Sequence, residues 1–242
     1  MKFLKVCSLA LLISMVSCDQ LQQIANEAAK QAGQSGPPTQ SEIASGIKEA
    51  LIVGAQNSVL DASKTNGFYS NSLIKIPFPP EAAKVEKTVR DLGLGSQVDK
   101  FVETLNHGAE QASKKAAPIF VSAIKQMTLR DVYDIWKGDN DAATQFLRRT
   151  TETKLKSEFR PVITTALDKV ELTKYWNPVV NTYNQIPLVT KVNPDLDEYV
   201  LQESLDGLFL LIAQEEAKIR QDPAARVTDI LQRVFGYNNG NY

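Results

Sequence analysis

The segment from Asp195 to Arg220 decides the fold that this sequence predicts, and it reads DLDEYVLQESLDGLFLLIAQEEAKIR. Its core apolar residues recur at intervals of four, three and four positions, which gathers them on one face of an α-helix: Leu201, Leu205, Leu208 and Ile212. Pro194 and Asp195, which precede this face, are typical of a helix start. A helix this apolar must bury that face, so the segment predicts a core helix.

The rest of the chain has the same helical character. Three capping boxes, each a Ser or Thr followed three residues later by Glu or Asp, predict helix starts at Thr39, Ser96 and Thr128. Gly138 is typical of a helix end, and no strand-like alternation of useful length occurs. We therefore predict an all-α protein with a single compact multi-helix domain of about seven to nine helices.

Three proline-containing segments give more specific expectations. The helix from Ser96 is expected to continue past Pro118, and the next long helix is expected to be bent or broken at Pro161. Asp222 and Pro223 are expected to cap the last helix.

A stripe of small residues lies on the helix that follows Thr39. Gly46, Ala50 and Gly54 recur every four residues and so share one face. We expect another helix to approach closely along this stripe. The charged neighbours Lys48 and Glu49 exclude a membrane-spanning helix here.

The first residues have the order of a bacterial export signal. Lys2 and Lys5 accompany an almost wholly apolar run from Val6 to Val16, which is shorter than the roughly 20 residues that span a bilayer. Met15-Val16-Ser17-Cys18 resembles a lipobox, in which the cysteine is acylated and becomes the first residue of the mature chain. The resemblance implies a lipid attached to Cys18; a plain signal peptide with an incidental cysteine is the alternative.

The cysteine count favours the lipid anchor. Of the two cysteines, Cys7 lies inside the predicted signal, so the mature chain keeps Cys18 alone and forms no internal disulfide. We expect an exported protein, lipid-anchored to an envelope membrane and facing the periplasm. Whether the membrane is the inner or the outer one stays open.

These features divide the chain into four parts. Residues 1–17 are the predicted signal peptide, 18–40 the lipidated N-terminus and flexible tether, 41–236 the helical domain, and 237–242 a disordered tail. The roughly 200 residues of the domain are enough for one sizeable core.

Composition and glycine spacing exclude two classes of protein. Loss of the two lysines in the signal changes the formal net charge from −1 to −3, so no nucleic-acid partner is expected. Gly93-Leu94-Gly95 follows no predicted strand and precedes no lysine at the spacing of a phosphate-binding loop. It predicts a turn between helices, and we expect no cofactor.

His107 is the single histidine of the chain. Glu103, His107 and Glu110 share one helical face, but a metal site would need similar ligands from a second helix. We interpret the three as a solvated polar face and expect no metal. A histidine-based triad and a two-histidine zinc site are excluded by the count, and we assign no catalytic residue.

Arg148 and Arg149 are adjacent in a predicted helix. Neighbouring helical residues diverge by about 100°, so one of these arginines is expected to face inward, where it needs a carboxylate partner. An internal ion pair is one interpretation. A binding site for an anion or a lipid headgroup is the other.

Glu215 and Glu216 follow the apolar stripe of the core helix. Glu216 lies four residues after Ile212, and a carboxylate on a core face needs a partner to stay charged. Arg220, four residues further, is in the favourable order for a pair, and Arg226 is also near. We expect a Glu–Arg lock between the last two helices; acid–base chemistry by the two carboxylates is the alternative.

Several motifs together carry a family resemblance: Ala117-Pro118-Ile119-Phe120, Arg148-Arg149-Thr150-Thr151, Leu205-Asp206-Gly207-Leu208-Phe209, Glu215-Glu216, Asp222-Pro223 and Val234-Phe235-Gly236. From about Ser41 to Gly236 the chain resembles the bacterial domain of unknown function family 4197, a family of exported, often lipid-anchored proteins. The resemblance implies one helical domain behind a signal sequence. It implies no known activity, so no functional residue is carried over.

The sequence favours a non-enzymatic binding or scaffold lipoprotein that acts on an envelope protein partner. Two alternatives stay open. One is a lipid or small apolar-ligand binder with Arg148 or Arg149 at the mouth of a groove between helices. The other is a hydrolase-like enzyme that uses Glu215 or Glu216. The sequence leaves the oligomeric state open.

Overall fold

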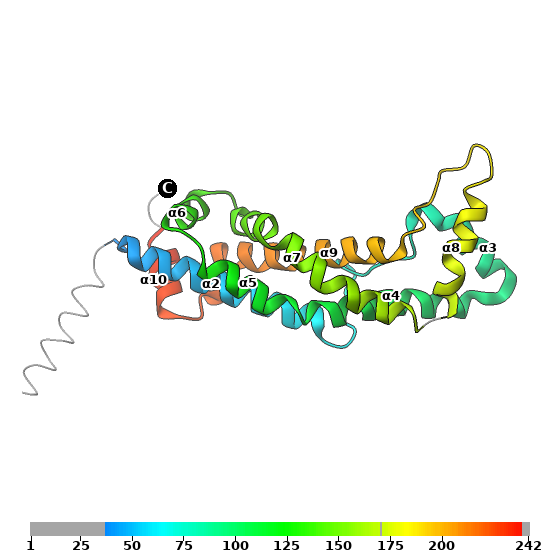
Figure 1. The fold of residues 1–242 in the computed structure, drawn as a ribbon. Helices are drawn as coiled ribbons and strands as arrows, with labels where there is room; N and C mark the ends of the chain where they lie inside the picture. Colours follow the sequence, from blue (N-terminus) through cyan, green and yellow to red (C-terminus); the bar gives the residue numbers. More distant parts are fainter. Residues whose placement is uncertain (1–36, 170, 239–242) are drawn as a thin grey trace, which may run out of the picture. The chain divides into compact units, whose positions relative to one another are not determined.

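The computed structural model describes residues 37–169 and 171–238 (Figure 1). Contacts between residues divide the chain after Pro38, and the fold described below is that of the unit that begins at Thr39. The predicted signal, Cys18 and most of the predicted tether lie outside the described residues.

The described residues form α-helices and no strand, which confirms the predicted all-α class. Within residues 37–169 and 171–238, nine α-helices are present: α2 (Gln40–Ser63), α3 (Ala83–Val89), α4 (Gly95–Ser113), α5 (Ala116–Lys125), α6 (Leu129–Lys137), α7 (Ala142–Leu167), α8 (Glu171–Tyr183), α9 (Leu196–Gln221) and α10 (Asp229–Asn238). Short 3-10 turns cover Pro80–Ala82 and Pro223–Ala225, and a π-helical turn covers Arg90–Leu94.

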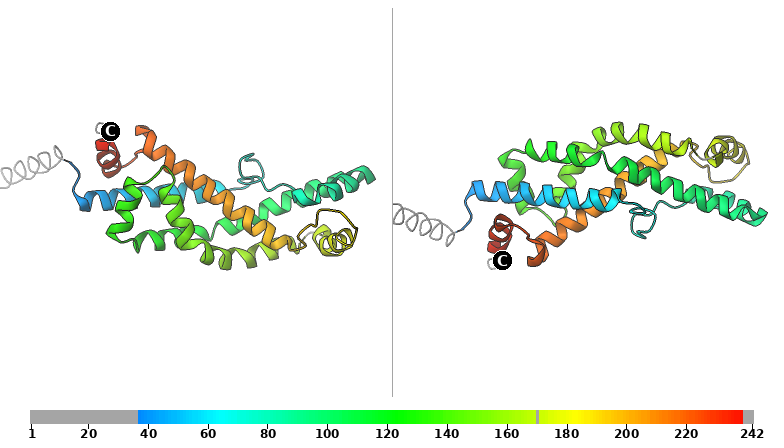
Figure 2. Two further views of the ribbon diagram at one scale, coloured as in Figure 1. Left: turned by 90° about the horizontal axis from the view of Figure 1, so that it is seen from above. Right: turned by 90° about the horizontal axis from the view of Figure 1, so that it is seen from below.

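The predicted core helix is α9, and the other long helices pack along it. Contacts join α9 to α2, α4 and α7, and the left view of Figure 2 shows it crossing obliquely over α2. The four residues of the predicted face are all buried: Leu201, Leu205, Leu208 and Ile212. Each such side chain contributes about 1.5–3 kcal/mol when it leaves water. Among the described helices, α9 has the most buried apolar residues.

The small-residue stripe of α2 brings two helices close, as predicted. A Cβ atom added to Gly46 would lie 2.7 Å from Cγ2 of Val234 in α10. One added to Gly54 would lie 3.5 Å from Cβ of Glu215 in α9. A larger side chain at Gly46 would therefore push α10 away.

Two of the three predicted capping boxes are present. The hydroxyls of Thr39 and Thr128 accept hydrogen bonds from the third residue of α2 and of α6, and the acidic side chains bond back. The prediction at Ser96 is wrong, because α4 begins at Gly95 and takes Ser96 inside it. Gly93 has a φ of 83°, so it turns the chain just before α4, and Asp99 instead binds Arg90 at 2.8 Å.

The proline-based expectations are corrected as well. The chain breaks between Ser113 and Ala116 and forms two helices, α4 and α5. In contrast, α7 runs without interruption through the exposed Pro161. Asp222 caps only the short turn that follows it, since its carboxylate accepts from the backbone N–H of Ala224.

The last helix starts at Asp229, later than predicted, and α10 includes Tyr237 and Asn238, which the sequence assigned to the tail.

A buried carboxylate fixes the segment between α2 and α3. Glu110 of α4 is 2% exposed and accepts hydrogen bonds from the backbone N–H groups of Asn66, Phe68 and Tyr69 at 3.1–3.3 Å. The interpretation of Glu110 as part of a solvated face is therefore wrong. His107 lies beside it, with Nε2 3.2 Å from Oδ1 of Asn66.

The start of α2 is tied to α10 by an ion pair. Oε1 of Glu42 accepts from Nε of Arg233 at 2.7 Å, and Oε2 accepts from the backbone N–H of Thr39 at 2.7 Å. The pKa of Glu42 is lowered to about 2. The largest cause is the hydrogen bond from the Thr39 backbone N–H, and the next is the hydrogen bond from the Arg233 side chain. Because this pKa is below the unfolded value of 4.5, the stabilisation is complete above that pH and is lost as the pH falls through about 2.

We expect the substitution Arg233→Gln to raise the pKa of Glu42 toward its ordinary value, because it removes the second of these causes. An NMR titration of the Glu42 carboxyl carbon measures this. Lys64→Gln, which removes a cation from an exposed pair with Asp61 at the other end of α2, is the control and should leave the titration unchanged. A Glu42 pKa that is the same with and without Arg233 would contradict the assignment.

Candidate functional site

Glu216 holds the junction between α6 and α7. Its buried carboxylate accepts hydrogen bonds from the backbone N–H groups of Ala143 and Thr144 at 3.0 and 2.9 Å, and from the Thr144 hydroxyl at 2.8 Å. These donors are the first residues of α7, so Glu216 acts as the cap of that helix from a distant element.

Arg220 completes this buried cluster. Its Nε and NH2 atoms donate to Glu216 at 3.1 and 2.9 Å, and NH2 also donates to the carbonyl of Ile135 near the end of α6. The predicted Glu–Arg pair therefore exists. The predicted location is wrong, because both residues belong to α9 and the pair secures α6 and α7. Arg226 instead donates to the carbonyls of Ile219 and Arg220.

Glu215 points to a different neighbour. Its carboxylate accepts from Nδ2 of Asn57 in α2 at 3.1 Å and from Nζ of Lys218 at 3.2 Å. Glu215 and Glu216 thus bind different helices, and the acceptor positions of Glu216 are occupied by α7 and Arg220. This geometry does not support paired acid–base chemistry by these carboxylates.

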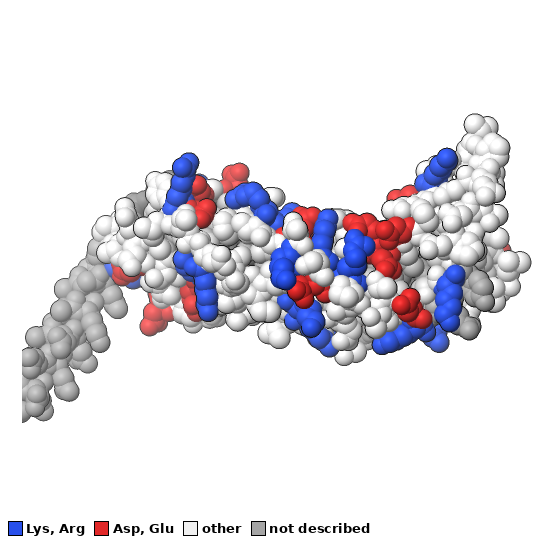
Figure 3. All heavy atoms as spheres, viewed as in Figure 1, with Lys and Arg blue, Asp and Glu red and all other residues white. Residues whose placement is uncertain are grey.

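Arg148 forms an ion pair with a carboxylate, but the pair is partly exposed rather than internal, because the side chains of Arg148 and Asp206 are 31% and 47% exposed. Its NH1 atom donates to Oδ1 of Asp206 in α9 at 2.7 Å, and its guanidinium lies 4.5 Å from the ring centre of Phe209. Figure 3 shows Lys and Arg interleaved with Asp and Glu over the middle of the viewed face, where α7 runs. Arg148 therefore belongs to the contact between α7 and α9.

Arg149 is exposed and lines a groove of about 630 Å³ between α5 and α7. Lys154 supplies a second cation, and Pro118 and Ile119 supply apolar surface. Asp131 lies in the same groove, and its hydrogen bonds with the Thr128 hydroxyl and backbone N–H lower its pKa. A charged carboxylate therefore offsets the attraction of the two cations for an anion.

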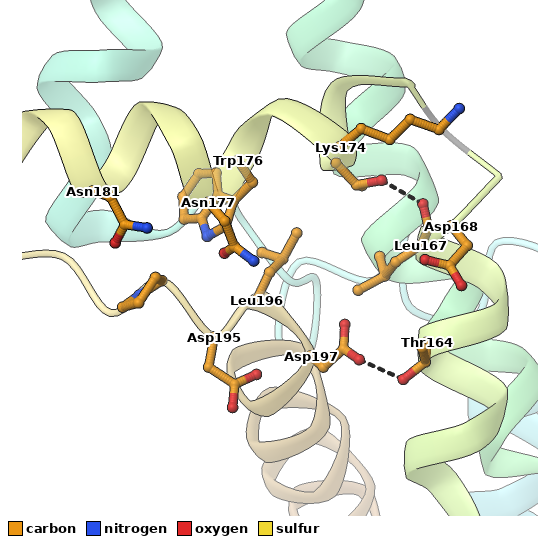
Figure 4. A pocket seen from close by; sticks show the side chains of 12 residues that line it. Thr164, Leu167, Asp168, Lys174, Trp176, Asn177, Asn181, Asp195, Leu196 and Asp197 are labelled. Atoms are coloured by element: carbon orange, nitrogen blue, oxygen red, sulfur yellow. Dashed lines mark hydrogen bonds between the residues drawn. The ribbon is translucent and has the colours of Figure 1, made fainter.

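A second concave site, which sequence analysis missed, lies where the end of α7, α8 and the start of α9 meet (Figure 4). We call it the Trp176 pocket. Its volume is about 520 Å³, and its lining is Thr164, Leu167, Asp168, Thr173, Lys174, Trp176, Asn177, Asn181, Pro194, Asp195, Leu196 and Asp197. The volume lies within the range of small-ligand sites, about 300–1,000 Å³.

The indole of Trp176 is the unusual group of this pocket. It is 5% exposed, with its ring 5.6 Å from that of Phe78 and 5.8 Å from that of Phe101. Its Nε1 atom is buried and has no hydrogen-bond partner among the described residues. Figure 4 shows this nitrogen on the edge of the ring toward Asn177 and Asp195. An unpaired buried donor costs about 1–3 kcal/mol, so a ligand acceptor that reached this nitrogen would recover that free energy.

The rest of the lining is mostly polar, with Leu167, Pro194 and Leu196 as its apolar members. Asn177 and Asn181 lie one helical turn apart on α8, and both are exposed. Asp195 caps α9 by accepting from the backbone N–H of Glu198 at 2.9 Å, and Asp197 accepts from the Thr164 hydroxyl. Carboxylates and amides thus surround the indole donor with acceptors and further donors. Among the described residues, no group of three or more His, Cys, Asp and Glu could hold a metal ion.

One signal for this pocket was present in the sequence. Trp176, Asn177 and Asn181 are close in the sequence, and in a helix the spacing of four residues places the two amides on one face. The segments around Asp168 and Asp195 join them only through the fold.

These contacts define an all-helical domain with a polar pocket at the ends of three helices. Residues 37–236 match the family described as Protein of unknown function (DUF4197), and the chain belongs to that family. This confirms the resemblance on which the family expectation rested. No curated protein and no solved structure matches the chain.

We expect Glu216→Ala to lower the free energy of unfolding by about 3 kcal/mol, because it leaves buried N–H groups of α7 and the Arg220 guanidinium without their acceptor. The matched substitution Glu215→Ala removes two surface contacts and should cost less than about 1 kcal/mol. Urea unfolding followed by circular dichroism measures both. Equal losses would show that Glu216 is not the cap of α7.

Proposed function

We propose that this protein is a lipid-anchored, non-enzymatic envelope protein that binds a small, neutral, polyhydroxylated ligand in the Trp176 pocket. The unpaired, buried indole N–H in a pocket of about 520 Å³ carries this proposal. Such a donor gains most from a ligand that presents an acceptor to it.

The polar lining selects the class of ligand. The indole N–H needs an acceptor, whereas the carboxylates of Asp168, Asp195 and Asp197 favour donors. A hydroxyl group does both. An anion would be repelled by the three carboxylates, which outnumber the one lysine of the lining. A saccharide-like molecule satisfies all of these groups at once.

The anchor part of the proposal depends on Cys18 and its lipobox-like surroundings. The proposal takes the 20 residues between Cys18 and Thr39 as a tether, and a flexible coil of that length would span on the order of 25 Å. Among the described helices, none is long and apolar enough to cross a bilayer. Attachment through a lipid is consistent with that finding.

Binding of an amphiphile beside Arg149 is a second candidate function. Arg149 and Lys154 next to Pro118 and Ile119 form the combination of cations and apolar surface that a lipid headgroup and chain would need. The charged Asp131 in this groove makes the Trp176 pocket the better-supported site.

Ligand binding is testable through the indole N–H signals, because the chain contains only Trp136 and Trp176. In an NMR titration with maltose and with N-acetylglucosamine, we expect the Trp176 indole signal to move and the Trp136 signal to stay. A Trp136→Phe variant assigns the two signals. Asn181→Ala should weaken binding about tenfold, the loss of one hydrogen bond.

Two controls accompany this titration. Gln214→Ala changes an exposed residue of α9 away from the pocket lining and should leave binding unchanged. Glucose 6-phosphate tests the selection against anions and should not move the Trp176 signal. If neither neutral saccharide moves that signal, the proposed ligand class is wrong.

The anchor is testable separately in bacterial cells supplied with radiolabelled palmitate. We expect the label in the unchanged protein and its loss in Cys18→Ser, because acylation requires the thiol. Ser17→Ala keeps a small residue before the cysteine and should retain the label. An unlabelled protein would remove the anchor from the proposal and leave the pocket unaffected.

A further inference from the structure

Helix α6 has apolar side chains on two sides. Val132 and Ile135 are buried against the core, as expected for a short surface helix. Leu129 and Tyr133 lie one turn apart on another side and are 68% and 58% exposed. Exposure of two large apolar residues in adjacent turns marks a contact surface more often than an isolated exposed leucine does.

These exposed residues border an apolar groove between α6 and the first turns of α2. The groove has a volume of about 510 Å³ and is lined by Gln40, Ile43, Ala44, Leu129, Arg130, Val132, Tyr133 and Trp136. We call this groove and its rim the α6 surface.

Trp136 is the aromatic centre of the α6 surface, with Tyr133 and Lys137 as neighbours. Its ring centre lies 6.2 Å from that of Tyr133, and Nζ of Lys137 lies 4.5 Å from it on the other side. The indole Nε1 of Trp136 is buried and has no hydrogen-bond partner among the residues described. Tryptophan and tyrosine with an apolar body and a polar tip, next to a long cationic side chain, suit the interface between a bilayer and water.

The position of the α6 surface indicates what covers it. Gln40 and Ile43, in the first turn of α2, come directly after the tether from Cys18. If the 20 residues between Cys18 and Thr39 behave as a flexible coil, their root-mean-square length is on the order of 25 Å, which sets the typical distance of this turn from the lipid. The α6 surface is therefore on the part of the domain that a lipid anchor brings nearest to the bilayer.

The charges on α6 favour a bilayer contact that does not depend on anionic lipid. Arg130 and Lys137 are balanced by Asp131 and Asp134, and Arg130 lies 3.8 Å from Asp134. Burial of Leu129, Tyr133 and the exposed part of Trp136 then supplies the attraction.

We propose that the α6 surface docks on the membrane that carries the lipid anchor, with Leu129, Tyr133 and Trp136 inserted at the level of the lipid headgroups. The inference rests on the proposed anchor for the nearness of the bilayer. Figure 1 places α6 and α8 at opposite ends of the helical unit. Docking through α6 would hold the Trp176 pocket away from the bilayer, open to molecules in the surrounding solution.

Quenching by brominated lipid tests the docking. The protein, purified from membranes with its intact mass recorded, is reconstituted on phosphatidylcholine vesicles with or without bromine on the acyl chains. We expect bromine to remove up to about half of the tryptophan emission, because Trp136 contacts lipid and Trp176 does not. Trp136→Phe should abolish the quenching.

Two surface variants separate docking from mere anchoring. The double substitution Leu129→Asn and Tyr133→Asn changes exposed residues only and should reduce the quenching at least twofold. Leu92→Asn changes an equally exposed leucine outside the α6 surface and should leave it unchanged. Raising the salt concentration should also have no effect.

The outcomes are distinct from those for the anchor. A lipid-bearing, vesicle-bound protein whose Trp136 is not quenched overturns the docking and leaves the anchor standing; a second copy or another protein would then cover the α6 surface. A protein whose mass shows no lipid but whose Trp136 is quenched supports the docking and overturns the anchor. Quenching that persists in the double variant also overturns the docking.

Discussion

The arrangement of the long helices depends on the hydrogen bonds that the buried carboxylate of Glu216 accepts. This carboxylate sits on α9, the helix with the most apolar buried face, and accepts the free N–H groups at the start of α7. Arg220 neutralises it and reaches the carbonyl of Ile135, so one pair fixes where α6 ends and α7 begins. Glu110 does the same for the segment before α3. A carboxylate is buried at either position only because backbone donors surround it.

The sequence predicted what depends on local spacing and missed what depends on distant donors. The face of α9 and the boxes at Thr39 and Thr128 follow from periodicity and from contacts three residues apart. Glu216 was identified as a paired carboxylate, but its donors lie over 70 positions away, and no local pattern points to them. The Arg148 partner is likewise a residue of another helix, Asp206. The prediction at Ser96 failed because a glycine with positive φ sets the start of α4.

Each of the two candidate sites contains one tryptophan, Trp136 at one end of the helical unit and Trp176 at the other. Both carry a buried indole N–H without a partner among the described residues, but their surroundings differ. Trp176 lies among amides and carboxylates, which favours a ligand rich in hydroxyl groups. Trp136 lies beside Ile43, Leu129 and Tyr133, which favours an apolar phase. The helices between the two tryptophans share one hydrophobic core, which holds the two sites at a distance from each other.

In the proposed arrangement, one end of the helical unit meets a bilayer and the other end binds a ligand from solution. Hydrogen–deuterium exchange of the anchored protein on vesicles, with and without maltose, tests both parts together. We expect slower exchange in residues 129–137 than in the Cys18→Ser protein free in solution, whether or not maltose is present. We expect slower exchange in residues 173–181 only when maltose is added. The arrangement is wrong if the exchange rate of residues 129–137 is the same with and without vesicles, or if that of residues 173–181 is the same with and without maltose.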